Sequence, residues 1–412
     1  MEITSAYIKR LVNRPGKPWQ GNLKFRDPSN RDKYKSVSKT FDRSKVKTKA
    51  QAMRALEAWR AQVEQEAAAP DAGKLVAEYV ADYVSNLEAA KSVEPSTIKG
   101  YRSTLEYIKD GFEGITIRDL KPQHVQAWER GLIDDGLSSS TVGKAHRLLK
   151  QVCKYAVEVE DLRRNPCDPV KPPQRTRTEP NALDSDGRAK VLGVLSNMEL
   201  EPLSVAAYIA LFTGMRRGEI CALTWADIDL ERNEITVSKA LGAGVGGTYL
   251  KTPKTGKRRV IPFSKQLGEI LARYRAVKRA EWVRANFMED APTTDSEFSK
   301  QYVLGTPDGR FCNPTRLGKD WQSLSKLYRF IGTENRACTF HDLRHTYATI
   351  AIANGADVRS VAANLGHANV AMTLNTYASA DAEAKRRAAE KVGAALEYKP
   401  ADVLQFGERE AI

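Results

Sequence analysis

The residues best suited to chemistry lie in one stretch, residues 339–377, which holds three of the five histidines. Thr339 and Asp342 have the spacing of a helix-capping box, and the apolar positions that follow predict a helix to about Ile352. The i, i+3 spacing puts His341 and Arg344 on one face, near the N-terminal end of that helix. Unpaired N–H groups and the helix dipole favour an anion there. A histidine and an arginine directed to the same point indicate a phosphate site.

Two more residues of chemical interest follow in the same stretch. Asp357 is expected to cap a second helix, which Gly366 closes so that His367 is presented in the turn. Asn369 can cap a further helix that carries Tyr377. Taken singly, such residues usually have structural roles: an H-x-x-R pair is commonly a solvated helix face, and a lone tyrosine commonly belongs to the core or the surface.

Taken together, these motifs closely resemble the C-terminal signature of the tyrosine recombinase (phage integrase) family. They are H-D-L-R-H-T at 341–346, L-G-H at 365–367, and Tyr377 ten residues after His367. The resemblance implies two further motifs upstream, and both are present. T-G-M-R-R-G-E at 213–219 matches the family's first arginine at Arg216. K-T-P-K-T-G-K-R-R-V-I-P-F at 251–263 places Lys254 in a predicted β-hairpin turn.

The resemblance implies a role for each residue. Arg216 and Arg344 would clamp the scissile phosphate, since each guanidinium can bind two phosphate oxygens and stays charged at any working pH. Tyr377 would be the nucleophile. Because a phenol has a pKa of about 10, it needs a base, and His341 is the candidate. His367 would donate a hydrogen bond to a non-bridging oxygen.

Two residues complete the implied site. Lys254 would be the general acid for the departing 5′ oxygen, and Glu219 would orient Arg216. Attack by the tyrosine would leave a 3′-phosphotyrosine and a free 5′-hydroxyl, so that a strand could be rejoined without ATP. The sequence has no carboxylate cluster of the kind that holds paired magnesium ions, and neither a metal nor another cofactor is expected.

Length and composition give a broader frame. The 412 residues have room for two or three domains, and no run approaches the roughly 18 apolar residues of a membrane span. The N-terminus lacks a signal-peptide core, so a cytoplasmic location is expected. The five cysteines are scattered, which favours neither a disulfide framework nor a zinc site. The net charge of +14 indicates a polyanionic partner, but charge alone fits RNA, DNA or ribosome binding equally well.

The basic charge is concentrated at the N-terminus. Through Arg60 the chain has 16 Lys and Arg against 5 Asp and Glu, so +11 of the +14 lies there. Residues 1–67 predict a three-stranded sheet with one packed helix from about 49 to 67, capped by Thr48. This module resembles the arm-type DNA-binding domain of many phage integrases. A basic surface without a specific site is the alternative.

The fold class expected for the whole chain is multi-domain α+β. Residues 73–165 carry apolar stripes of four helices, at about 75–87, 96–108, 122–132 and 138–156, and resemble the family's all-α core-binding domain. Ser96 is expected to cap the second of these helices, and His124 and His146 are expected at a helix surface or boundary. Residues 166–180 are rich in proline and basic residues and are expected to be an interdomain linker.

Residues 181–398 are expected to form the mixed α/β catalytic domain, mainly helical with a small antiparallel sheet, before a polar tail at 399–412. Within it the sequence predicts helices at about 186–195 and 203–212, and further helices between 266 and 331. It predicts one strand over 227–240, a flexible loop at 241–247 and a hairpin over 248–263.

The function that the resemblance implies is site-specific DNA recombination, most like that of the integrase of a temperate phage or other mobile element. The expected partner is double-stranded DNA with core and arm-type attachment sites, bound by a homotetramer in the nucleoid of a bacterial host cell. A host DNA-bending factor and an excisionase are further expected partners. Two alternatives remain open: a type IB topoisomerase-like enzyme, and a catalytically inactive DNA-binding protein.

Overall fold

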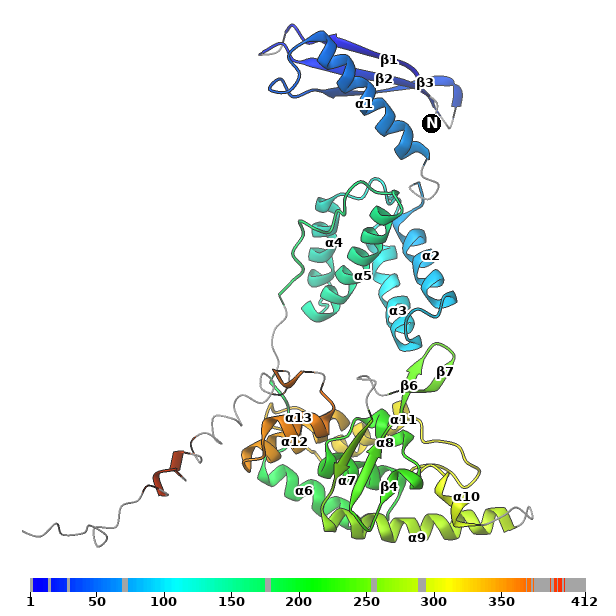
Figure 1. Ribbon diagram of the computed structural model, residues 1–412, viewed down its shortest axis with the longest axis vertical. Coiled ribbons are helices and arrows are strands. Elements are labelled where there is room, and N and C mark those ends of the chain that lie inside the picture. Colours follow the sequence, from blue (N-terminus) through cyan, green and yellow to red (C-terminus); the bar gives the residue numbers. More distant parts are fainter. Residues whose placement is uncertain are drawn as a thin grey trace, which may run out of the picture. The chain divides into compact units, whose positions relative to one another are not determined.

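The computed structural model describes residues 3–13, 16–27, 30–68, 73–174, 179–252, 258–287, 294–367, 369–371, 373, 386, 389, 390, 392–394 and 396 (Figure 1). The chain divides into two compact units, residues 1–177 and 178–412. The mixed α/β fold class expected from the sequence is confirmed. In the described part of the chain, no helix combines the length and the apolar character needed to cross a membrane.

The first unit begins with a small antiparallel sheet in the order β1-β2-β3, followed by one helix. These elements are β1 (Ile3–Arg10), β2 (Trp19–Asp27), β3 (Asn30–Thr40) and α1 (Lys49–Ala68). Thr48 caps α1 as predicted, because its Oγ1 accepts a hydrogen bond from Gln51 N at 3.2 Å. Leu23 and Phe41 from the sheet side pack with Leu56 and Trp59 of α1 in a small core. The predicted three-stranded sheet with one packed helix is confirmed.

Four helices follow in the first unit: α2 (Val76–Ala89), α3 (Pro95–Gly111), α4 (Pro122–Asp134) and α5 (Ser139–Glu158). Each buries the apolar stripe that its sequence predicts, and Ser138 caps α5 by accepting from Thr141 N at 3.2 Å. The predicted cap at Ser96 is wrong. Glu94 is the N-cap of α3 and Pro95 is its first helical residue, where the fixed φ of proline suits a helix start.

The expectation for His146 is also wrong. Its side chain is buried between α4 and α5, where its Nδ1 is hydrogen bonded to Oε1 of the buried Glu129. His146 lies on the same helix stripe as Val142, Leu149 and Cys153, which face the core. A buried imidazole needs a polar partner, and Glu129 of the neighbouring helix supplies it. His124 is half-buried at the start of α4, and its Nδ1 accepts from Lys121 N at 3.4 Å.

The second unit combines helices with short strands. Its helices are α6 (Ser185–Ser196), α7 (Pro202–Thr213), α8 (Arg217–Ala222), a 3-10 turn η1 (Trp225–Asp227), α9 (Lys265–Phe287), α10 (Asp295–Ser299), α11 (Pro314–Leu327), α12 (Phe340–Ala353) and α13 (Val358–Leu365). Its strands are β4 (Ile228–Asp229), β5 (Glu234–Val237), β6 (Ala240–Gly244), β7 (Gly247–Lys251) and β8 (Arg259–Pro262). The predicted helices at 186–195 and 203–212 correspond to α6 and α7, and those between 266 and 331 to α9, α10 and α11.

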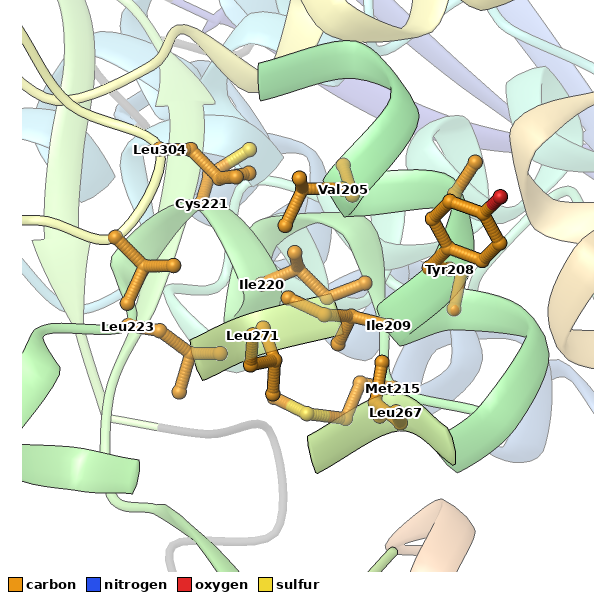
Figure 2. Packing of buried hydrophobic residues seen from close by; sticks show 14 of the residues in the cluster. Val205, Tyr208, Ile209, Met215, Ile220, Cys221, Leu223, Leu267, Leu271 and Leu304 are labelled. Atoms are coloured by element: carbon orange, nitrogen blue, oxygen red, sulfur yellow. The ribbon is translucent and has the colours of Figure 1, made fainter. Parts of the chain in front are cut away.

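The core of this unit forms around α7, which is buried along most of its length. Val205 and Ile209 of α7 lie among Ile220 of α8 and Leu267 and Leu271 of α9 (Figure 2). Burying a side chain of this size contributes about 1.5–3 kcal/mol, so these contacts fix α8 firmly against α7. The segment between them carries the first candidate arginine.

Three strand predictions differ from the structure. The single strand expected over 227–240 is two strands, β4 and β5, which pair antiparallel with Ile228 opposite Ile235. Asp229 Oδ1 accepts from the backbone N–H groups of Glu231 and Arg232 and turns the chain between them. The loop expected at 241–247 is instead the β6–β7 hairpin, which Gly246 and Gly247 turn with positive φ angles of 82° and 119°.

The hairpin expected over 248–263 is not formed by β7 and β8. β7 pairs with β6, whereas β8 pairs with β5 in a different sheet. The predicted turn between them, including Lys254, lies outside the described residues.

Candidate active site

The N-terminal end of α12 is held by the predicted capping box. Thr339 N and Thr339 Oγ1 donate to Asp342 Oδ2 at 2.7 and 2.8 Å, and Asp342 N donates back to Thr339 Oγ1 at 3.3 Å. The box fixes where the helix begins, and therefore which face His341 and Arg344 share one turn later. The buried Phe340 and Leu343 anchor the same turn in the core.

His341 lies beside a second histidine, His345. Its ring and that of His345 are perpendicular, with centroids 4.8 Å apart. The pKa of His341 is lowered to about 4, first by its partial removal from water and then by the nearby His345 and Arg344. Burial also lowers the pKa of His345. His341 is therefore neutral at physiological pH and able to accept a proton.

Arg344 is buried and joins two other segments of the unit. Its Nη1 donates to Gly214 O and its Nη2 donates to Leu365 O, both at 2.8 Å. The first acceptor lies just after α7 and the second at the end of α13. A guanidinium has five N–H donors in a fixed plane, so these two bonds set the orientation of the whole group.

Arg216 follows a tight turn at the end of α7. Gly214 has a left-handed φ of 66°, and a Cβ there would lie 2.4 Å from Tyr347 Cδ1, so only glycine fits. Met215 is buried in the core of Figure 2 and anchors the turn. The Arg216 side chain is 28% exposed, and its Nη2 donates to Gly366 O at 2.9 Å.

Glu219 is hydrogen bonded to Arg216 through both of its carboxylate oxygens. Its Oε1 accepts from Arg216 Nη1 at 3.1 Å and its Oε2 accepts from Arg216 N at 2.9 Å. Burial alone would raise the pKa of this carboxyl. Hydrogen bonds and charge from Arg259, and then from Arg216, outweigh that effect and hold the pKa below its ordinary value. Glu219 is therefore ionised inside the protein.

His367 follows the α13 terminus, where Gly366 has a left-handed φ of 63°. Its Nδ1 is hydrogen bonded to Thr373 Oγ1 at 2.7 Å. Its pKa is lowered to about 4, first by burial and then by the charges of Arg344 and Arg216. When the Thr373 hydroxyl donates to Nδ1, the proton of the neutral ring is on Nε2, which can donate to a phosphate oxygen.

The structure thus brings together five of the seven candidate residues: Arg216, Glu219, His341, Arg344 and His367. Lys254 and Tyr377 lie outside the described residues. A pocket of about 630 Å³ opens beside this group, lined by Arg216, Thr339 and His341 and by residues of β6 and α11. Two guanidinium groups and two neutral imidazoles are near enough to affect one another's charge, an arrangement suited to an anion that undergoes proton transfer.

Sequence reasoning missed three residues that contact this group. Arg259 hydrogen bonds to Glu219, His345 contacts His341, and Thr373 contacts His367. The motif K-R-R-V-I-P-F contains Arg259, but nothing in it indicates a partner forty positions earlier. The described residues contain no group of three or more His, Cys, Asp or Glu side chains placed to hold a metal ion.

Two family models match this chain: the phage integrase SAM-like domain over residues 75–171, and the phage integrase family over residues 194–384. A XerC-like tyrosine recombinase of Caldanaerobacter subterraneus subsp. tengcongensis is 28% identical over 319 residues, which cover 73% of this chain and 78% of that protein. The ICEBs1 integrase of Bacillus subtilis is 27% identical over 274 residues, which cover 66% of this chain and 70% of that protein.

Solved structures agree on the fold. The Tn1549 transposon integrase in complex with transposon right end DNA matches with a TM-score of 0.62 at 24% identity, over 77% of this chain and 99% of that one. A lambda integrase dimer bound to a COC′ core site matches with a TM-score of 0.57 at 16% identity, over 86% of this chain and 92% of that one. Both the helical region and the region that holds the arginines and histidines have family matches, and the chain belongs to the phage integrase family, the tyrosine recombinases.

Proposed function

We propose that this protein is a site-specific DNA recombinase that breaks and rejoins DNA strands through a covalent 3′-phosphotyrosine intermediate. The observation that carries the proposal is the convergence of Arg216, Arg344, His341 and His367 at one site, with both imidazoles neutral at physiological pH. A scissile phosphate placed there would meet two positive charges and two groups able to exchange a proton.

The reaction assigns one task to each group. Tyr377 Oη attacks the phosphorus and its proton passes to His341, while Arg216 and Arg344 stabilise the charge on the non-bridging oxygens. His367 Nε2 donates to one of these oxygens. The bond from phosphorus to the 5′ oxygen breaks, and Lys254 supplies the proton that this oxygen takes up. A 5′-hydroxyl from a partner strand reverses these steps, so the phosphodiester energy is conserved.

The role of the two residues outside the described part rests on their sequence positions. Tyr377 is ten residues after His367, and Lys254 is five residues before Arg259 in the segment that leads into β8. Arg259 hydrogen bonds to Glu219 and to Asn364 of α13, and His367 directly follows the end of α13. These connections support the assignment of Tyr377 and Lys254 to the same site.

The substrate we infer is a DNA attachment site of a mobile element, recombined by a homotetramer in the cytoplasm of a bacterial cell. Relatives named ICEBs1 integrase and Tn1549 transposon integrase support this, and the Tn1549 enzyme was solved with the DNA of its transposon end. The match of residues 75–171 to a phage integrase SAM-like domain supports a core-binding role for α2 to α5.

We assign arm-site binding to the N-terminal sheet. One face of the sheet is covered by α1, and strand alternation gives the other face a polar character that includes the lysines Lys9 and Lys24. The residues of that face follow from the strand register: Ser5, Tyr7, Lys9, Gln20, Asn22, Lys24, Ser36, Ser38 and Thr40. Asn22 lies at its centre, and its buried Nδ2 has no hydrogen-bond partner among the described residues. The lysine, amide and hydroxyl side chains of this face are of the kinds that hydrogen bond to the DNA backbone.

A basic pocket at the end of this sheet fits a backbone phosphate. It has a volume of about 420 Å³ and is lined by Arg10, Lys17, Arg43 and Lys47. The guanidinium of Arg10 also lies over the ring of Trp19, 5.6 Å from its centroid. Four like charges around one pocket repel each other, and an anion there relieves the repulsion.

The experiment that tests the proposal is a denaturing-gel assay for a covalent adduct. Wild type, Tyr377→Phe and the matched control Tyr328→Phe, whose side chain is 41% exposed at the surface, are incubated with labelled duplexes from the region flanking the gene. We expect adducts with wild type and Tyr328→Phe, and none with Tyr377→Phe although it still binds the duplex. Adduct formation by Tyr377→Phe, or salt-sensitive binding without any adduct in wild type, would contradict the proposal.

A further inference from the structure

Three arginines meet at the C-terminal end of α13. Arg259 Nε donates to Asn364 O at 2.9 Å, Arg344 Nη2 to Leu365 O at 2.8 Å and Arg216 Nη2 to Gly366 O at 2.9 Å. The last carbonyl groups of a helix have no partner within the helix, and they form the negative end of its dipole. Three consecutive carbonyls are thus satisfied by three guanidinium groups, and His367 follows directly.

Arg259 differs from the other two because its remaining hydrogen bonds engage both carboxylate oxygens of Glu219. Its Nη1 donates to Glu219 Oε1 at 3.1 Å and its Nη2 to Glu219 Oε2 at 2.6 Å. The Arg259 side chain is 11% exposed and that of Glu219 is 2% exposed. A planar guanidinium matches a carboxylate in this bidentate way, whereas an ammonium does not.

Glu219 is saturated by these contacts. Oε1 accepts from Arg216 Nη1 and Arg259 Nη1, and Oε2 accepts from Arg216 N and Arg259 Nη2. A carboxylate has about four acceptor positions, and all four are used. Arg216 therefore shares one oxygen through its side chain and cannot form a bidentate pair with Glu219. Without Arg259, the buried carboxylate would attract the Arg216 guanidinium into the two vacated positions.

We propose that Arg259 is a positioning residue for strand cleavage: it occupies Glu219 and the end of α13 so that Arg216 remains directed at the scissile phosphate. It holds β8, α8 and α13 together through three hydrogen bonds, all made before DNA is bound. The inference rests on the proposed function, because it assigns Arg216 to the phosphate. Gly366 leaves room for this contact, since a Cβ there would lie 3.0 Å from the Arg259 Cζ.

The neighbouring Arg258 offers a matched control. It is exposed, whereas Arg259 is largely buried, and both variants lose the same charge one position apart. Wild type, Arg259→Gln, Arg259→Lys and Arg258→Gln are compared with Tyr377→Phe on the duplex that yields the adduct. We expect Arg259→Gln to lower the rate constant of adduct formation at saturating DNA about 10–100-fold while the Kd for the duplex changes less than about threefold. Arg258→Gln should keep the wild-type rate constant.

Two further measurements separate positioning from folding. Arg259→Lys keeps the charge but loses the planar guanidinium that binds Glu219 in a bidentate way. We expect this variant to fold and to form the adduct at least about fivefold more slowly than wild type. In a Glu219→Gln background, Arg259→Gln should cost much less than in wild type, because both residues act through one contact. Wild-type rate constants for Arg259→Gln or Arg259→Lys, or fully additive losses, would overturn the inference. The proposed function fails separately, through an adduct in Tyr377→Phe.

Discussion

Arg216 and Arg344 donate hydrogen bonds to the carbonyl groups of consecutive residues, Gly366 and Leu365, at 2.9 and 2.8 Å. The two guanidinium groups are therefore spaced by the backbone at one helix end, and the repulsion between them is offset by its carbonyl dipoles. A site arranged in this way needs little reorganisation when the phosphate arrives. Electrostatic preorganisation of this kind is commonly the largest contribution to catalysis.

The two clamping arginines are expected to respond differently to lysine substitution. Arg344→Lys should lower the cleavage rate at least about 100-fold and also reduce the free energy of unfolding by about 1–3 kcal/mol, because one buried backbone carbonyl loses its donor. Arg216→Lys should lower the rate to a similar degree with a smaller loss of stability, since its side chain is 28% exposed. Denaturant unfolding measures the loss of stability, and the rate of adduct formation measures cleavage. Equal stability losses would show that burial of Arg344 has no structural consequence.

Cleavage should persist to lower pH than an ordinary histidine base allows. The base must be neutral, and the pKa of His341 is about 4 rather than 6.5. We expect kcat/KM, which reports the free enzyme, to stay level from about pH 7.5 to 5.5 and to fall below about pH 5. Initial adduct rates at subsaturating DNA measure this. A midpoint near pH 6.5 would show that His341 titrates normally.

The same lowered pKa values affect stability. His341 and His367 bind a proton more readily in the unfolded chain than in the folded one. Their contribution to the free energy of unfolding is therefore fully present above about pH 6.5, and it is lost as the pH falls from there towards about 4. The free energy of unfolding should decrease over this range. In a combined His341→Gln, His367→Gln variant, the free energy of unfolding should decrease less steeply with falling pH. An unchanged dependence on pH would show that the pKa values of the two histidines are not lowered.

Gly214 should tolerate alanine less well than Gly355, although both have left-handed φ angles, 66° and 83°. A Cβ at Gly355 meets no atom within 4 Å, whereas one at Gly214 meets Tyr347 and Leu365 below 3 Å. Gly355→Ala should cost about 1 kcal/mol from backbone strain alone. Gly214→Ala should cost more and should also slow cleavage, because the turn that carries Arg216 is displaced. Similar effects of the two variants would show that the close contacts at Gly214 add nothing to the cost of backbone strain.

Loss of a basic side chain from the N-terminal pocket should weaken arm-site binding in a salt-dependent way. Arg43→Gln should lower the slope of log K against log salt by about 0.9, the value for one phosphate contact on duplex DNA. Lys45, two positions from Arg43, is exposed and does not line the pocket. The variant Lys45→Gln therefore removes the same charge from outside the pocket. It should leave the slope nearer its wild-type value. Equal slopes for the two variants would show that the pocket does not bind a phosphate and contributes only general positive charge.

The sequence predicts best where the signal is local. The Thr339–Asp342 box, the caps at Thr48, Ser138 and Asp357, and the helix stripes involve residues within a few positions of each other, and the structure confirms them. The H-D-L-R-H-T, T-G-M-R-R-G-E and L-G-H motifs contain five candidate residues that the fold brings together, namely Arg216, Glu219, His341, Arg344 and His367.

The sequence fails where the partner is distant or the segment is short. The strands β4 to β8 have two to five residues each, too few for alternation to reveal them, and their pairing depends on tertiary contacts. The bond between Arg259 and Glu219 joins residues 40 positions apart, and that between Arg216 and Gly366 spans 150. His146 lay on an apolar stripe, but its burial depended on Glu129 of another helix.

The most direct test of the central claim is to identify the amino acid that carries the DNA in the covalent adduct. The wild-type adduct is digested with nuclease and trypsin, and the nucleotide-bearing peptide is sequenced by mass spectrometry. The tryptic peptide 360–385 contains a single tyrosine, Tyr377, so the assignment is unambiguous. We predict a nucleotide joined through its 3′-phosphate to Tyr377 in that peptide. A nucleotide on any other residue, or one joined through its 5′-phosphate, would contradict the account.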